Sequence, residues 1–266
     1  MDIHGHRGCR GLHPENSLPA FKKALDLKLS TLELDVVISK DHKVVVSHEP
    51  FMNHEIALDP SGNNIPQHDE KSFNLYAMTY DTIKSYDCGS KTHERFPFQK
   101  NEKVYKPLLT QVIDLAEERS HQKIRYNIEI KSMPEYDDVY SPKVSVFVDL
   151  VIEIIENQGI HDRVTLQSFD LRALEFINKK KLGVRIALLI DKTERMDSKL
   201  KKLSFQPDII SPHFKLLTRE IVLEYQNRGF QVIPWTVNKR ADIVSMLRFN
   251  VDGIISDFPD RVLMLK

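Results

Sequence analysis

The sequence contains little that would cross-link the chain or anchor it in a bilayer. Its 266 residues include two cysteines, Cys9 and Cys88. Two cysteines cannot build a disulfide framework, and no Cys/His set has zinc-binding spacing. A single bridge between them stays open, although a buried thiol is the simpler interpretation of Cys9. No apolar run reaches the length of a membrane span, so we expect no stable membrane insertion.

The sequence also lacks an excess of either charge. Lys and Arg together number 38, as do Asp and Glu, so the formal net charge is zero. A neutral chain has no long-range field that attracts polyanions, and we expect no nucleic-acid partner. A basic-then-apolar leader is missing because the first strand signal begins at Asp2 or Ile3. We therefore expect a cytoplasmic protein, or a periplasmic or secreted one if a leader was removed.

Short apolar runs alternate with amphipathic stretches from about residue 107 onward. The runs are mostly apolar on both faces, which is typical of parallel strands covered by helices. About eight such units predict an α/β fold of the TIM (β/α)8 barrel type. Helices are expected over about 17–27 and 142–159, with others capped by Asp170 and Thr218. Strands are expected at 3–6, 31–38, 44–48, 126–131, 164–169, 184–190, 208–213, 231–236 and 253–257.

These nine strands are one too many for an eight-stranded barrel. The link 39–43 is far too short for a parallel crossover, which needs about a dozen residues. Residues 31–38 and 44–48 should therefore form an antiparallel hairpin, which would return His48 to the level of Glu33 and Asp35. We expect one domain over 1–266, with an insertion at about 51–106 whose aromatic residues favour an ordered segment.

Ionisable residues recur where the predicted strands end, although burying an unpaired charge costs several kcal/mol or more. Glu33 and Asp35 have i, i+2 spacing, so both side chains point to one face of their strand. Glu129 and Lys131 repeat that spacing on another strand. Strand ends meet on the catalytic face of a parallel barrel. Converging carboxylates would repel one another without a cation, and oxygen ligands favour Mg²⁺ or Ca²⁺ over zinc.

Taken singly, these residues have simpler explanations. Glu33 alone would be half of a buried ion pair, and His6 alone a hydrogen-bonded core histidine. We expect His4, His42 and His68 to be solvated. The complete set is much harder to explain without a shared site for a metal and an anionic substrate.

A series of motifs runs in order along nearly the whole chain. It comprises His6-Arg7-Gly8, Pro14-Glu15-Asn16-Ser17, Glu33-Leu34-Asp35, Ser47-His48, Ile128-Glu129-Ile130-Lys131, Gln167-Ser168-Phe169, Trp235-Thr236-Val237-Asn238 and Asp252-Gly253-Ile254-Ile255-Ser256-Asp257-Phe258-Pro259. This series resembles the glycerophosphodiester phosphodiesterase family. The resemblance implies a TIM barrel that hydrolyses a small-molecule glycerophosphodiester to sn-glycerol 3-phosphate and an alcohol.

The resemblance also assigns the reactive groups. Glu33, Asp35 and Glu129 would hold one divalent cation, Mg²⁺ or Ca²⁺. His6 and His48 would be the general acid and base, in an order that the sequence does not decide. The nucleophile, water or the glycerol 2-hydroxyl, is equally open.

Five further residues would serve the substrate by the same resemblance. Arg7 would bind the phosphate, with Lys131 near it, and Trp235 would pack against the glycerol. Gln167 and Asn16 would be secondary contributors.

The chain departs from the family pattern at two positions. Glu49 follows His48 where the family usually has Asp, and Ser17 replaces the commoner Thr. Neither change removes a proposed catalytic group. Two other functions stay open: a lysophospholipase-D-like activity, and a degenerate barrel that binds phosphodiesters without turnover. Head-group preference and oligomeric state are not predicted.

Overall fold

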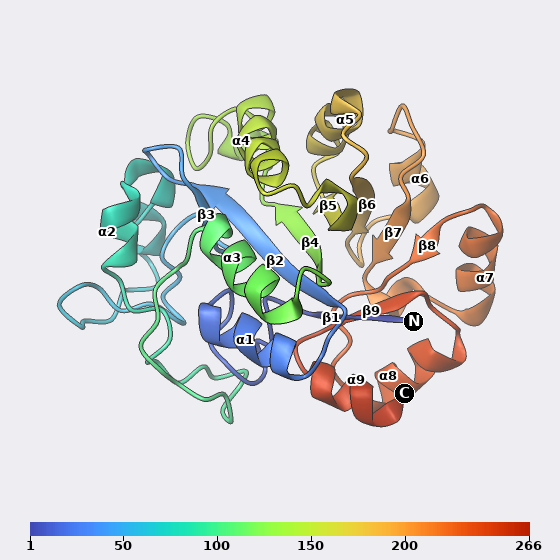
Figure 1. Cartoon of the computed structure of the whole chain (residues 1–266), viewed down its shortest axis with the longest axis horizontal. Coiled ribbons are helices and arrows are strands. Elements are labelled where there is room, and N and C mark those ends of the chain that lie inside the picture. Colours follow the sequence, from blue (N-terminus) through green and yellow to red (C-terminus); the bar gives the residue numbers. More distant parts are fainter.

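The apolar runs of the sequence become neighbouring strands of one sheet. In the computed structural model, which describes residues 1–266, eight parallel strands follow the order β8-β7-β6-β5-β4-β2-β1-β9 (Figure 1). They form a nearly closed barrel, so the predicted TIM-barrel class is confirmed. The parallel strands are β1 (Asp2–Gly5), β2 (Thr31–Ile38), β4 (Arg125–Ile130), β5 (Val164–Ser168), β6 (Arg185–Ile190), β7 (Ile209–Pro212), β8 (Gln231–Val232) and β9 (Gly253–Ser256).

Backbone hydrogen bonds join the two ends of this sheet. Asp252 N donates to Val232 O, and Ile255 N donates to Pro234 O, both at 3.0 Å. β8 was expected to continue to Thr236. It is shorter because Pro234 has no N–H to give to a ladder.

Helices surround the barrel and bury its outer face in a core of 46 residues. The predicted N-caps Asp170 and Thr218 are confirmed, and Ser17 caps α1: the side-chain oxygens of all three accept backbone N–H groups of the helices that follow them. The helices are α1 (Leu18–Asp26), α2 (Tyr80–Lys84), α3 (Leu109–Ser120), α4 (Val144–Asn157), α5 (Leu171–Lys180), α6 (Met196–Leu200), α7 (Arg219–Asn227), α8 (Arg240–Arg248) and α9 (Pro259–Leu265).

β3 (Val44–Val46) confirms the antiparallel hairpin. Among the strands it pairs with β2, in the register Val36 to Val46 and Ile38 to Val44. Ser47 N then donates to Asp35 O at 3.0 Å, so the chain arrives beside the carboxylates as expected.

Residues 51–106 are irregular except for α2 and the short 3₁₀ turns η1 (Glu70–Ser72) and η2 (Leu75–Ala77). They contribute most of a second core of 11 buried residues, which reaches the outer face of the hairpin through Val37 and Val45. Cys88 belongs to this second core and Cys9 to the main one; both thiols are buried and free.

One expectation about a histidine was wrong. His42 and His68 are exposed, but His4 is buried inside the barrel. Its Nδ1 lies 3.3 Å from Asn127 Nδ2, and its Nε2 lies 3.2 Å from Asp2 Oδ2. Alternation along a strand turns His4 toward the barrel interior, where the side chain of Asn127 contacts its ring.

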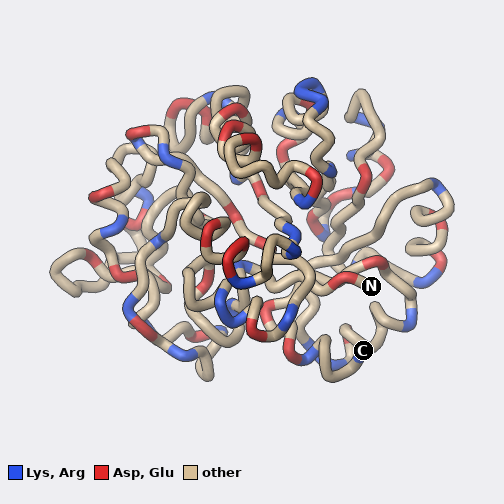
Figure 2. Tube along the Cα trace, in the orientation of Figure 1, with Lys and Arg blue, Asp and Glu red and all other residues tan.

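The charged residues are interspersed along the whole trace (Figure 2). None of the helices combines the length and the apolar character that a bilayer crossing demands. Any attraction for an anion must therefore be local.

Candidate active site

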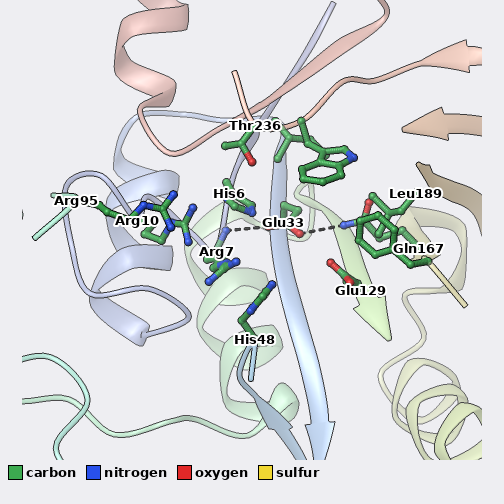
Figure 3. Close-up of a pocket in the computed structure, with 13 residues that line it drawn as sticks. His6, Arg7, Arg10, Glu33, His48, Arg95, Glu129, Gln167, Leu189 and Thr236 are labelled. Atoms are coloured by element: carbon green, nitrogen blue, oxygen red, sulfur yellow. Dashed lines mark hydrogen bonds between the residues drawn. The ribbon is translucent and has the colours of Figure 1, made fainter. Parts of the chain in front are cut away.

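A cavity of about 270 Å³ lies where the strands end at their carboxyl termini (Figure 3). This is the catalytic face of a parallel barrel. Side chains from β2, β4 and β5, and from the segments after β1, β3 and β8, converge on it. The sequence-predicted residues that line the cavity are His6, Arg7, Glu33, His48, Glu129, Gln167 and Trp235.

Three carboxylates form the floor of the site. Glu33, Asp35 and Glu129 each offer an oxygen, and these oxygens lie within 4.8 Å of one another. All three residues are buried. Asp35 Oδ1 is inaccessible and has no hydrogen-bond partner, which is costly unless another group binds it. The donor set is all oxygen, as a hard divalent cation prefers.

The charge balance of the surroundings also fits a divalent cation. Among the buried and half-buried side chains, which exclude the exposed Arg95, six carboxylates face four cationic groups, so with neutral imidazoles two negative charges are left over. The carboxylates are Glu15, Glu33, Asp35, Glu49, Glu129 and Asp257, and the cations are Arg7, Arg10, Lys106 and Lys131. One divalent cation would neutralise this excess.

The pKa values of two of these carboxyls reflect the same excess of negative charge. Burial and the nearby Asp35 carboxylate raise the pKa of Glu33 well above its usual value. Burial also raises the pKa of Glu129 to about 7, although Lys131 opposes this shift. A divalent cation held by these carboxylates would oppose both shifts, because it favours their ionised forms.

His6 is held by the far end of the chain. Its Nδ1 lies 2.5 Å from Asp257 Oδ1, so the carboxylate accepts the Nδ1 proton and Nε2 is left as an acceptor. Burial lowers the pKa of His6 to about 4. Arg10 and Arg7 contribute to this lowering, whereas Asp257 opposes it. The imidazole is therefore neutral at pH 7.

His48 has a matching arrangement. Its Nδ1 donates to Glu49 Oε1 at 2.6 Å, and its Nε2 accepts from Lys131 Nζ at 3.0 Å. Burial, Arg7 and Lys131 all lower the pKa of His48. Glu49, which differs from the usual family pattern, thus holds the imidazole directly. In both histidines a carboxylate fixes Nδ1–H, so Nε2 is the nitrogen that can exchange a proton; in His48 this atom also accepts from Lys131.

Arg7 contributes both its backbone and its guanidinium. Arg7 N donates to Glu33 Oε2 at 2.8 Å, while Nη1 donates to Glu15 Oε1 at 2.8 Å. Nε lies 3.4 Å from Asp35 Oδ2. The tight turn depends on Gly8, whose φ of +83° is left-handed and whose added Cβ would lie 2.7 Å from Ala20 Cβ.

Two side-chain amides donate hydrogen bonds to the carboxylates of the site. Gln167 Nε2 donates to Glu33 Oε1 at 2.9 Å and still lines the cavity. Asn16 was expected among the substrate-binding residues, but it is buried and donates to Asp35 Oδ2 at 2.9 Å. Asn16 does not line the cavity, and the Asp35 carboxylate accepts its amide hydrogen bond.

Several site residues were not predicted from the sequence. Asp257, Glu15 and Arg10 form a buried ion network around His6 and Arg7. Asp257 and Glu15 lie inside recognised motifs, and Asp257 directly follows the last strand, so its position was a usable signal. Arg95 also lines the cavity but comes from the irregular insertion, where no periodicity marks it.

The chain matches the profile of the glycerophosphoryl diester phosphodiesterase family over residues 6–261. A glycerophosphodiester phosphodiesterase of Bacillus altitudinis is 30% identical over 273 residues, covering 99% of this chain and 97% of that protein. A lysophospholipase D of Rattus norvegicus is 26% identical, covering 97% of this chain and 83% of that protein.

Solved structures show the same fold. A Silicibacter pomeroyi protein assigned as a glycerophosphoryl diester phosphodiesterase superposes with a TM-score of 0.90 at 27% identity, covering 100% of this chain and 92% of that one. An Oleispira antarctica phosphodiesterase, solved with its product sn-glycerol 3-phosphate, gives 0.79 at 17% identity, covering 99% and 96%.

Fold and site together define an enzyme of the (β/α)8 barrel class, with its reactive groups at the carboxyl ends of the strands. Within that class, the chain belongs to the glycerophosphodiester phosphodiesterase family, whose members are phosphoric diester hydrolases.

Proposed function

We propose that this enzyme hydrolyses glycerophosphodiesters to sn-glycerol 3-phosphate and an alcohol, with one divalent cation and two histidines. The observation that carries the proposal is one cavity lined by Glu33, Glu129 and two carboxylate-held imidazoles. The product bound to the Oleispira antarctica relative supports the same product here.

The two imidazoles suit proton transfer. Each is neutral and held at Nδ1 by a carboxylate, so each can accept a proton at Nε2. In a diester hydrolysis one neutral imidazole takes the proton of the attacking hydroxyl at Nε2. The other must enter the step as an imidazolium, and it gives its Nε2 proton to the departing alkoxide and returns to the neutral form. Asp257 and Glu49 then stabilise the imidazolium forms, because each lies within 2.6 Å of its ring nitrogen.

The cationic side chains suit the phosphoryl group. Glu33, Asp35 and Glu129 would hold Mg²⁺ or Ca²⁺, which when bound supplies charge stabilisation to phosphoryl oxygens. Arg7 lines the cavity and would bind a phosphoryl oxygen through its guanidinium. Lys131 keeps Glu129 and His48 in place at 2.8 and 3.0 Å.

The test is hydrolysis of glycerophosphocholine, with sn-glycerol 3-phosphate measured enzymatically. Chelation should abolish turnover, and Mg²⁺ or Ca²⁺ should restore it. His6→Ala and His48→Ala should each lower kcat about 10²- to 10⁴-fold, the usual contribution of a general acid or base. His68→Ala, at an exposed position, is the control. Undiminished turnover in either site variant would remove that histidine from the mechanism.

A lysophospholipase-D-like activity is the second candidate. The cavity has an apolar end formed by Phe169, Leu189, Trp235 and Ile255, where an acylated glycerol could lie. The rat lysophospholipase D shows that a relative carries this activity. Comparing kcat/KM for glycerophosphocholine and lysophosphatidylcholine separates the two candidates. Binding of either diester without turnover would favour the non-catalytic alternative instead.

A further inference from the structure

A second cavity of about 260 Å³ adjoins the catalytic one. His48, Glu129 and Phe169 line both cavities, so the two meet at the proposed catalytic groups. A phosphodiester carries two organic arms that leave the phosphorus in different directions. Two cavities that join at the reactive centre can therefore take one arm each.

The walls of the second cavity are aromatic and acidic. Phe51, Tyr136 and Phe169 provide rings, Met133 provides a thioether, and Glu49 provides a carboxylate. Lys131 also lines it, but its ammonium is held by Glu129 Oε1 at 2.8 Å and by His48 Nε2 at 3.0 Å. The cationic charge on this wall is thus already paired, and the aromatic faces are the main free recognition surface.

The first cavity has the opposite character. Arg7, Arg10 and Arg95 line it, and they outnumber its two carboxylates, Glu33 and Glu129. The lining of the second cavity instead has two carboxylates and one ammonium group. Arg7 and Arg10 are paired with Glu15 and Asp257, whereas Arg95 has no carboxylate within ion-pair distance and is exposed at the rim. A cationic arm entering this cavity would meet an uncompensated guanidinium. The two cavities thus differ in the sign of charge that they tolerate.

The aromatic wall is held in place from several directions. Tyr136, in the 3₁₀ turn η3 (Pro134–Tyr136), packs edge-on against Tyr140 at 5.3 Å, and Tyr140 packs against Phe51 at 6.2 Å. The following residue, Asp137, accepts two hydrogen bonds from Arg172 at 2.8 and 3.1 Å. A preorganised wall of this kind loses little entropy when a ligand binds.

We infer that the second cavity binds the departing alcohol and selects a quaternary or primary ammonium head group, of the choline or ethanolamine type. The inference rests on the proposed function, since it names the alcohol that the same site releases. Aromatic faces attract such cations, Glu49 adds a negative charge, and Arg95 excludes the cation from the first cavity. The glycerol arm is left to the first cavity with Trp235.

Binding of the released alcohol tests the inference without turnover. Calorimetric titration should show choline chloride binding more tightly than 3,3-dimethyl-1-butanol, its neutral isostere, by about tenfold. Tyr136→Leu should remove this difference, and Tyr136→Phe, which keeps the ring, should preserve it. Equal affinity of the wild type for both compounds, or binding of neither, would overturn the inference even in a preparation without activity.

Substrate discrimination gives the second test. Tyr136→Leu should lower kcat/KM for glycerophosphocholine about tenfold and that for glycerophosphoglycerol less than about twofold. Melting temperatures check that both Tyr136 variants are folded. Equal losses on both substrates, or no loss on either, would overturn the head-group inference while glycerophosphoglycerol turnover keeps the proposed function. Failure to hydrolyse any glycerophosphodiester would instead refute the proposed function.

Discussion

At the scale of single residues, the site is organised by carboxylates that bind imidazoles. Asp257 and Glu49 each accept the Nδ1 proton of a histidine, so the tautomer of both rings is fixed by hydrogen bonding. His6 is uncharged at pH 7, since burial lowers its pKa to about 4. A buried neutral histidine also has a consequence for stability.

We expect His6 to make the fold less stable in mild acid. Between the unfolded pKa of about 6.5 and the folded value of about 4, the unfolded chain binds a proton that the folded chain does not. The free energy of unfolding should therefore fall by about 2 kcal/mol from pH 7 to pH 5 through this one group. Urea unfolding of the wild type and of His6→Gln at both pH values measures it.

The variant should show the smaller acid-induced loss, because glutamine does not titrate. His68→Gln, at an exposed histidine, should retain the wild-type pH dependence. Parallel pH profiles for wild type and His6→Gln would show that His6 is not held neutral.

At the scale of elements, the proposed metal ligands belong to two neighbouring strands that are hydrogen-bonded to each other. β2 carries Glu33 and Asp35, and β4 carries Glu129, which pairs with Asp35 in the parallel register. The strand ladder therefore sets the separation of the carboxylates. A cation in this cluster would relieve repulsion between the two strands and stabilise the sheet itself.

We expect Mg²⁺ or Ca²⁺ to raise the melting temperature of the chelated protein by about 5 °C at saturating concentration. Glu129→Gln should abolish most of this rise without destabilising the ion-free protein, since it removes one excess negative charge. Thermal unfolding at about pH 8, where the carboxyls are most ionised, measures both effects. A melting temperature that the ions leave unchanged in the wild type would argue against the metal site.

The elements also show which parts of the fold the sequence predicts. β2 and β4 are recognisable because apolar residues alternate with polar or charged ones at i, i+2 spacing. The short link 39–43 permits only a hairpin. The length of β8 is not predictable in this way, because Pro234 ends the regular ladder while the chain continues along the barrel. The pattern of apolar residues indicates burial, but it does not show where a ladder lacks a backbone N–H group.

The same limit applies to the site. Glu33, Asp35 and Glu129 were predictable since strand geometry brings them together. The positions of Arg95 and Tyr136 depend on irregular segments whose conformation is fixed by tertiary contacts, such as Arg10 and Arg95 over the Phe96 ring at 5.0 and 5.5 Å. His4 was misjudged because an isolated histidine carries no sign of the polar partners that bury it.

At the scale of the whole molecule, two apolar cores meet on opposite faces of one hairpin. The main core contains Val36 and Val46, and the insertion core contains Val37 and Val45. Successive side chains of a strand point to opposite faces, so one face of the hairpin packs into the main core and the other into the insertion core. The insertion is therefore packed against the element that carries His48, Glu33 and Asp35, and the two cores should unfold together.

We expect Ile83→Ala, at a fully buried position of the insertion core, to destabilise the protein by about 2–5 kcal/mol. The melting curve should keep a single transition at lower temperature. Phe98→Ser, in the same segment but 95% exposed, should change stability by less than about 0.5 kcal/mol. An early separate transition in Ile83→Ala, seen by calorimetry, would mean that the insertion folds independently.

The hydrogen bond between His6 and Asp257 joins residues 251 positions apart. During synthesis from the N-terminus, the hairpin with Glu33, Asp35 and His48 emerges early, yet His6 has no carboxylate until the last strand arrives. A nascent chain thus carries most of the proposed catalytic groups before the carboxylate that holds His6 has been made. We therefore expect activity in a refolding assay to report closure of the barrel rather than formation of its parts.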